Sequence, residues 1–281
     1  MNRRARNLLL GAAAVSLAAC GGGGVNSTPT PTPAPLDPIF NAVIKSQQFA
    51  AVGASHTYEG DQGPQLAAGE QLQVRYVESS NSYEVQLPHS ETWTGISYFS
   101  SGVGEPTNFG GPTADLYFQG DYRYSRLFQW SDNGSTVFGY EAIGMATAAN
   151  GIPVTGSADY SGQVWGSTSE FHPDGYMSIK GDIALSFNFG LGSLSGNISP
   201  VLQKDFAPYS LGTIEFRDTV YSAGGTTFGG KFDTNVAGLN SFSGQFAGPN
   251  AQELIGNFAL PYVSPIDSQT YQADGAFVAR H

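Results

Sequence analysis

Apolar and polar residues alternate along most of this chain with a period of two, a pattern typical of β-strands that bury one face. In the first half of the chain, Gln71–Val77 alternates in this way, and Tyr83–Leu87 continues the pattern after a polar turn. Farther on, Tyr122–Ser131 and Ser135–Ile143 flank Asp132-Asn133-Gly134, where an Asn-Gly pair tolerates the positive φ angles of a tight turn. We predict strands at the first two segments and a β-hairpin at the second two.

From about residue 153 to the C-terminus the alternation becomes regular and predicts eight strands. Seven of them share an apolar-x-Gly-x-apolar motif, such as Phe242, Gly244 and Phe246. Since residues i, i+2 and i+4 of a strand lie on one face, each motif places a glycine between two apolar side chains on the same side of the sheet. The predicted strands are 158–166, 179–189, 193–200, 212–221, 226–235, 239–248, 252–261 and 271–280.

Glycine inside a strand needs a reason, because it packs no side chain and loosens the strand. A small closed barrel supplies one, since large and absent side chains must alternate in its narrow interior and glycine lets the strand coil sharply. We therefore predict an all-β protein with an eight-stranded antiparallel β-barrel over 151–281, preceded by a smaller β-rich domain over 38–150. Helix signals are weak, and the best lies at Leu36–Ala51. A β-sandwich stays open as the alternative to the barrel.

The N-terminal segment is typical of a lipoprotein signal peptide. Residues 1–19 combine three arginines with a short apolar stretch, too short to span a bilayer. They end in Leu17-Ala18-Ala19 before Cys20, which is the lipobox pattern of bacterial lipoprotein precursors. We expect Cys20 to be lipidated, and residues 20–37, rich in Gly and Thr-Pro, to form an extended tether. Gly21 follows the cysteine in place of the Asp linked to inner-membrane retention, which favours the outer membrane.

The composition is acidic, with 12 basic and 23 acidic residues and a formal net charge of −11. This balance argues against nucleic acid and anionic lipid surfaces as partners, because both are themselves negatively charged. The 37 glycines and the few charged residues favour a β-rich exported protein over a helical cytosolic one.

The sequence offers no recognisable catalytic machinery, and we predict no catalytic residues, no metal site and no resident cofactor. The four histidines are not at metal-ligand spacing, and we expect each in a surface loop: His56, His89, His172 and His281. The alternative is a haem or metal ligand, since imidazole and phenolate both bind iron. The first candidates for such ligand binding are His89, Tyr122 and Tyr124.

One segment is more specific than the rest of the chain. Phe246–Phe258 resembles the Phe-x-Gly-Pro-x-Ala-x-Glu-x-x-Gly-x-Phe signature of the transferrin-binding protein B β-barrel domain. Three further stretches are similar to the first, second-to-third and last strands of that barrel, namely Pro153–Gly162, Leu185–Gly196 and Asp274–Arg280. The resemblance covers roughly residues 150–281 well and the preceding region loosely.

The resemblance implies a β-rich handle subdomain followed by an eight-stranded barrel, with room here for a single such lobe. It implies an outer-membrane lipoprotein displayed on the cell surface with the help of a surface lipoprotein assembly modulator. It also implies capture of a host iron protein, haem or another solute for uptake, with a TonB-dependent receptor as a possible partner, and no enzymatic activity. The long transferrin-capturing loops of the family have no match here, so the ligand stays open. A structural or adhesion lipoprotein without a nutrient ligand is the alternative, and an enzyme that uses scattered carboxylates is a third reading.

Overall fold

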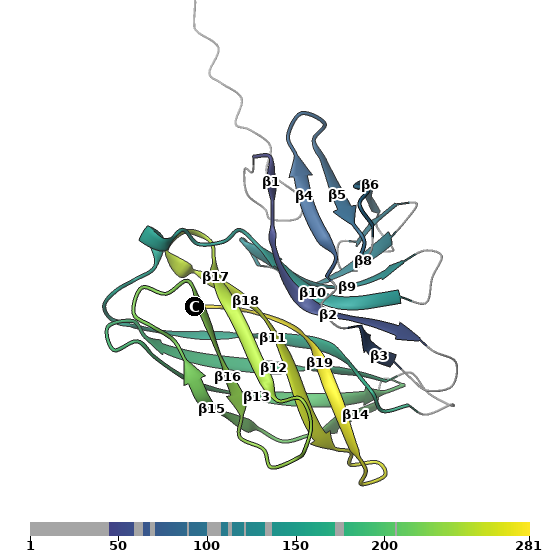
Figure 1. Ribbon diagram of the computed structural model, residues 1–281, viewed down its shortest axis with the longest axis vertical. Helices are drawn as coiled ribbons and strands as arrows, with labels where there is room; N and C mark the ends of the chain where they lie inside the picture. The colour runs from purple at the N-terminus through teal and green to yellow at the C-terminus, as the bar shows by residue number, and fades with distance from the viewer. Residues whose placement is uncertain are drawn as a thin grey trace, which may run out of the picture. The chain divides into compact units, whose positions relative to one another are not determined.

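The computed structural model describes residues 45–58, 64–67, 71–88, 90–99, 108–111, 114–120, 122–132, 137–171, 177–205 and 207–281. All of them belong to one compact unit, Pro35–His281 (Figure 1). The segments predicted as signal peptide (1–19) and lipidated tether (20–37), with Cys20, lie outside the described residues. Across the described part of the chain, the structure has no helix that could cross a bilayer.

The C-terminal half is a closed antiparallel barrel, as the sequence predicted (Figure 1). Its strands pair in the order β12-β11-β19-β18-β17-β16-β15-β13, and pairing of β12 with β13 closes the ring. A sandwich of two open sheets is therefore wrong. All eight predicted strands are present, as β11 (Ser157–Thr168), β12 (Met177–Asn188), β13 (Ser193–Lys204), β15 (Ile214–Val220), β16 (Thr227–Phe232), β17 (Ser241–Ala247), β18 (Glu253–Val263) and β19 (Thr270–Arg280). The short strand β14 (Ala207–Ser210), which was not predicted, pairs with the end of β13.

The glycines of the repeated motif face crowded positions, as the barrel argument requires. A Cβ at Gly230 would lie 2.8 Å from the ring of Phe242, and one at Gly196 would lie 2.8 Å from the ring of Phe216. At Gly256 the ring of Phe277 occupies the space instead. At these three positions an aromatic side chain of another strand fills the room that the glycine leaves, so large and absent side chains alternate in a narrow interior.

The barrel interior is a continuous apolar core rather than a channel. Its largest fully buried side chains are aromatic, and several rings contact one another edge-on, as Phe187 does with Tyr160 and Phe228. Tyr160 adds a 2.5 Å hydrogen bond from its hydroxyl to the carbonyl of Ala251, in the short 3₁₀ turn η3 (Pro249–Ala251) that precedes β18. Eight strands give an interior that side chains just fill.

The preceding region, here called the handle, is a second β-structure. Its strands pair in the order β1-β4-β5-β6-β7-β8-β9-β10-β2-β3. Only Phe49 separates β1 from β2, so the two strands form one continuous stretch of chain. Its first part, β1, pairs with β4, and its second part, β2, pairs with β10, which closes the handle sheet into a ring. The strands are β1 (Gln47–Gln48), β2 (Ala50–Tyr58), β3 (Pro64–Ala67), β4 (Gln73–Val77), β5 (Ser82–Gln86), β6 (Thr94–Phe99), β7 (Asn108–Gly110), β8 (Ala114–Gln119), β9 (Ser125–Asp132) and β10 (Val137–Gly144). A short 3₁₀ turn, η2 (Ala149–Gly151), leads from the handle into the barrel.

The handle confirms the predicted strands and corrects the weak helix. β4 pairs with β5, and β9 pairs with β10, while residues 133–136 between β9 and β10 lie outside the described residues. The weak helix signal at Leu36–Ala51 corresponds to no helix where the structure describes it, because Gln47–Gln48 belong to β1 and β2 begins at Ala50. There the N–H of Phe49 donates to the carbonyl of Val74 (3.0 Å), so cross-strand pairing prevails over a weak local preference.

A candidate binding cleft beside the handle–barrel junction

A third apolar cluster joins the handle to the barrel. Along β10, Phe138, Tyr140 and Ala142 belong to this cluster, whereas Ile143 packs into the handle core. This follows the alternation of a strand, so β10 serves two cores with its two faces. The cluster consists of Tyr122, Leu127, Phe138, Tyr140, Ala142, Trp165, Ile255, Ala276 and Val278. Handle and barrel therefore share an apolar cluster.

The glutamate of the signature segment fastens this junction. Glu253 begins β18 of the barrel, and its carboxylate accepts hydrogen bonds from the backbone N–H groups of Arg123 (2.7 Å) and Tyr124 (2.9 Å) and from the hydroxyl of Ser125 (2.7 Å). Ser125 is the first residue of β9 in the handle, and Arg123 and Tyr124 directly precede that strand. Glu253 is only 4% exposed, and its hydrogen bond from Ser125 is buried, whereas those from Arg123 and Tyr124 are partly buried. The signature thus acts as a structural joint in this chain.

A buried polar pair crosses the same interface. His56 of β2 lies within hydrogen-bonding distance of Asp274 of β19 through its Nε2, and both side chains are buried. The imidazole also stacks on Phe138, with ring centroids 5.2 Å apart. The prediction that each histidine lies in a surface loop is therefore wrong for His56, because its strand faces the barrel. His281 is exposed at the C-terminus, and His172 lies outside the described residues.

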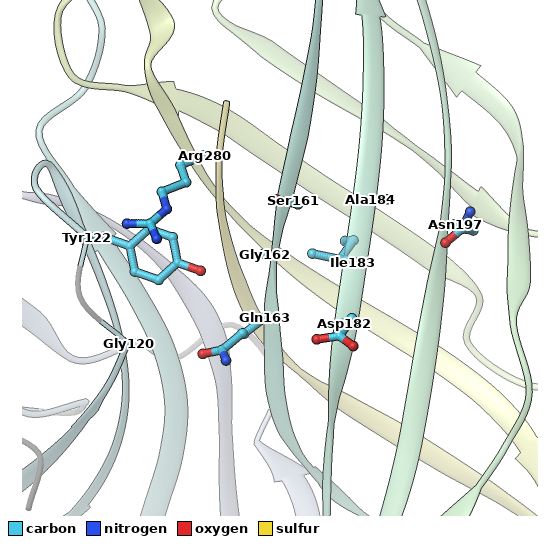
Figure 2. A pocket seen from close by; sticks show the side chains of 10 residues that line it. All are labelled: Gly120, Tyr122, Ser161, Gly162, Gln163, Asp182, Ile183, Ala184, Asn197 and Arg280. Atoms are coloured by element: carbon cyan, nitrogen blue, oxygen red, sulfur yellow. The ribbon is translucent and has the colours of Figure 1, made fainter.

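A cleft of about 510 Å³ opens between the handle loop that follows β8 and the outer face of the barrel (Figure 2). Gly120 and Tyr122 contribute from the handle side. The barrel side comes from four neighbouring strands, and consists of Ser161, Gly162 and Gln163 on β11, Asp182, Ile183 and Ala184 on β12, Asn197 on β13 and Arg280 on β19. Pockets of this size are large enough for a small organic ligand.

The strand register explains the shape of the cleft. Arg280, Ser161, Ala184 and Asn197 face one another in one row across β19, β11, β12 and β13. The small side chains of Ser161 and Ala184 in the middle of this row form the shallow floor of the cleft, and the long side chain of Arg280 lies at the β19 end of the row. Asp182 belongs to the next row, on the strand beyond β11. The outer surface therefore carries a cation and an anion across a shallow floor.

Most polar side chains of the cleft have no protein partner. Among the described residues, the side chains of Gln163, Asp182 and Asn197 make no hydrogen bond or ion pair, although other polar residues on the outer face pair across strands. Ser243, for example, donates to Asn257 between β17 and β18 (2.6 Å). Polar groups that converge on a concave surface without satisfying one another are available to a bound molecule.

Tyr122 and Arg280 form one wall of the cleft. The guanidinium carbon of Arg280 lies 5.4 Å from the centre of the Tyr122 ring, an arrangement that favours a cation–π contact (Figure 2). Burial raises the pKa of the Tyr122 hydroxyl, and the charge of Arg280 offsets this only in part. The hydroxyl is therefore protonated at neutral pH and can donate a hydrogen bond.

The barrel matches a known family. Residues 152–281 match the family model described as the C-lobe and N-lobe beta barrels of Tf-binding protein B. This segment is a transferrin-binding protein B-like barrel. The resemblance inferred from the signature segment is thereby confirmed, and the match begins at the residue after the handle's last 3₁₀ turn.

Several solved structures are similar to this chain. The intact Ap-TbpB, with its N and C lobes, is 15% identical with a TM-score of 0.44, and the match covers 82% of this chain and 45% of that one. The isotype 1 transferrin-binding protein B of Neisseria meningitidis is 14% identical with a TM-score of 0.46, covering 82% and 43%. The N-lobe of lactoferrin-binding protein B of Moraxella bovis is 13% identical with a TM-score of 0.31, covering 84% and 99%.

The chain spans about half the length of the intact transferrin-binding proteins that it matches. No curated protein matches it in sequence.

Of the ligand-binding candidates chosen from the sequence, Tyr122 lies in the cleft beside the transferrin-binding protein B-like barrel. Tyr124 does not line it, because its ring packs against Gly248 and below the guanidinium of Arg123, whose carbon is 5.4 Å from the ring centre. His89 lies outside the described residues. Within the described ranges, no group of three or more potential metal ligands comes together.

Sequence reasoning missed the barrel residues of the cleft, namely Gln163, Asp182 and Arg280. Each alternates with core residues along its strand, so the pattern marks it only as outward-facing. The missing information was the pairing register that brings β19, β11 and β12 side by side.

Proposed function

We propose that this protein is an exported binding lipoprotein. In this proposal Cys20 carries the lipid, the segment 20–37 is the tether, and the lobe is displayed on the outer surface of the outer membrane, where it captures a ligand for uptake. The lipobox before Cys20 supports the anchor, and the family match over 152–281 supports a binding role. The proposed role includes no catalytic step.

The observation that carries this proposal is the packed barrel interior. Side chains such as Phe232, Phe246 and Phe277 fill it and are almost fully buried. A barrel filled in this way has no room for a guest in its core. The lobe is therefore suited to hold a partner on its surface, with the shared apolar cluster and Glu253 keeping handle and barrel in one arrangement.

The proposed ligand is a host iron-carrier protein or haem. Solved proteins of similar fold are described as transferrin-binding and lactoferrin-binding, and this naming supports the first ligand class. A TonB-dependent receptor would then take up the released iron or haem, and a surface lipoprotein assembly modulator would place the lobe outside the cell. A structural or adhesion role without a nutrient ligand is the competing function.

The ligand test uses residues 35–281, which form one compact unit. The immobilised lobe is exposed separately to host transferrin, lactoferrin and haemoglobin, and haem is titrated against the free lobe while the Soret band is followed. Saturable retention of one iron protein, or a Soret shift that saturates at one haem per lobe, supports capture for uptake. If neither occurs, the capture proposal fails and the adhesion reading takes its place.

The anchor is tested separately on the full chain. Cells that express the protein are labelled with radioactive palmitate, and the wild type is compared with Cys20→Ser. Label on the wild type alone, with the wild type accessible to antibody on intact cells, is the expected result. Equal labelling of both proteins would refute the assignment of Cys20.

A further inference from the structure

The cleft beside the junction combines features of a small-molecule site rather than of a protein interface. It is concave, it is lined by polar groups from five segments, and Gln163, Asp182 and Asn197 have no partner among the described residues. We infer that this cleft binds a short peptide with free termini, with Arg280 on the peptide carboxylate and Asp182 on its ammonium group. This site is separate from the surface capture proposed above, and neither requires the other.

The two charges of the cleft match the two ends of a zwitterion. Arg280 lies on β19 and Asp182 on β12, with β11 between them. Along the strands, Asp182 is displaced by two residues from the row that contains Arg280. From a strand spacing of about 4.8 Å and a rise of about 3.4 Å per residue, their Cα atoms are roughly 12 Å apart. An arginine fork pairs well with a carboxylate, and a carboxylate accepts strongly from an ammonium group.

This separation selects the length of the ligand. In an extended chain each residue adds at most about 3.3–3.6 Å, so two or three residues place the terminal charges roughly 6–10 Å apart. The hydrogen bonds at the two ends of the peptide, about 2.8 Å each, supply the rest of the distance. A single amino acid carries both charges on one carbon and reaches only one of the two side chains. The cleft volume of about 510 Å³ leaves room for the longer ligand.

The remaining lining suits a peptide backbone. Gln163 and Asn197 each offer an amide that donates and accepts, which are the two functions of a peptide group. The floor between them is made of Ser161 and Ala184, small enough for a backbone to lie close. The Tyr122 ring has no free face for stacking a sugar, because Arg280 lies over it and the residue is only 6% exposed.

The test titrates trialanine into residues 35–281 and measures heat by calorimetry. We expect one site per lobe with a dissociation constant below about 1 mM. Trialanine acetylated at its N-terminus and amidated at its C-terminus is expected to bind at least tenfold more weakly, and alanine alone likewise. These comparisons change the ligand and leave the protein intact, so they do not depend on the folding of any variant.

Protein variants then assign the two ends. Asp182→Asn is expected to weaken trialanine at least tenfold and to leave N-acetylated trialanine unaffected, whereas Arg280→Gln is expected to weaken both. Asp218→Asn, an exposed aspartate on β15 outside the cleft, is the matched control and should bind as the wild type does. Absence of binding up to about 10 mM, which corresponds to a binding free energy weaker than about −2.7 kcal/mol, would overturn the inference. Binding that is insensitive to both blocked termini and both cleft variants would overturn it as well.

Discussion

Glu141 is a carboxyl group placed inside the handle core, and it gives the lobe a predictable pH dependence. The residue lies on β10 and is fully buried. Its Oε1 accepts a 2.6 Å hydrogen bond from the N–H of Leu72, while Oε2 has no hydrogen-bond partner among the residues that the structure describes. Burial raises the pKa of Glu141 from 4.5 to about 8, with the Leu72 N–H and the nearby Trp130 side chain offsetting part of the rise.

The sign of the effect follows from which state holds the proton. Between pH 4.5 and about 8 the folded lobe keeps Glu141 protonated, whereas the unfolded chain ionises it. Unfolding then releases a proton, so stability falls as the pH rises through this window and levels off above it. One unit of pKa corresponds to about 1.4 kcal/mol, so the whole window weakens the folded state by roughly 5 kcal/mol.

Glu141→Gln removes this dependence. The amide oxygen still accepts from Leu72, and the side chain keeps its size while losing its titration. Urea unfolding of residues 35–281, followed by tryptophan fluorescence at pH 5, 6, 7 and 8, gives the free energy of unfolding of both proteins. Between pH 5 and pH 8, the free energy of unfolding of Glu141→Gln should rise by roughly 4 kcal/mol relative to that of the wild type.

Glu84→Gln is the matched control for the same chemical change. Glu84 is a partly exposed handle carboxylate that accepts from Arg75, and its variant provides the reference slope for the pH series. If the Glu141→Gln difference from wild type stayed constant over the series, or followed the Glu84→Gln slope, the argument from burial would be refuted.

Three further predictions concern packing and the junction. Gly256→Ala forces a Cβ into the ring of Phe277 and should lower the free energy of unfolding by about 3 kcal/mol. Gly95→Ala is the control, because a Cβ there meets open space, and it should change the free energy of unfolding by less than about 0.5 kcal/mol in the same urea titration. Glu253→Gln sets an amide N–H₂ against N–H donors and should cost about 2–4 kcal/mol; a loss under 0.5 kcal/mol would contradict its role as a joint. Asp274→Ala leaves His56 buried without its hydrogen-bond partner and should lower the free energy of unfolding by about 3 kcal/mol. If the two side chains act as a pair, the double variant with His56→Ala should lower it no more than either single change does.

The barrel could be predicted from the sequence because its constraint repeats. In seven of the eight strands a glycine such as Gly244 lies between two apolar neighbours on the same face, because the narrow interior favours that arrangement. The handle was less predictable because its strands are short and its closure depends on one distant pairing. The N–H of Phe49 donates to the carbonyl of Val74, and no local sequence pattern predicts that contact.

The candidate site could be predicted only in part, because its residues come together only through the pairing register of strands that are distant in sequence. Tyr122 was chosen for its phenol, and the structure places it in the cleft for another reason, since its ring closes the junction beside Arg280. Arg280, Gln163 and Asp182 are ordinary outward-facing residues of three different strands. They become a site only when β11 pairs with β19 on one side and with β12 on the other.

The signature segment shows why a family resemblance carries more about architecture than about ligands. The carboxylate of Glu253 accepts from three donors just before and at the start of β9, and the hydroxyl of Thr147 donates a hydrogen bond to the carbonyl of Gly248 (2.6 Å). A buried carboxylate whose oxygens are already taken cannot also bind a ligand without leaving those N–H groups unpaired, at a cost of about 1–3 kcal/mol each. The signature therefore preserves the joint between handle and barrel. The residues that choose a ligand have to lie on faces that the joint leaves free, such as the outer face of β11 and β12.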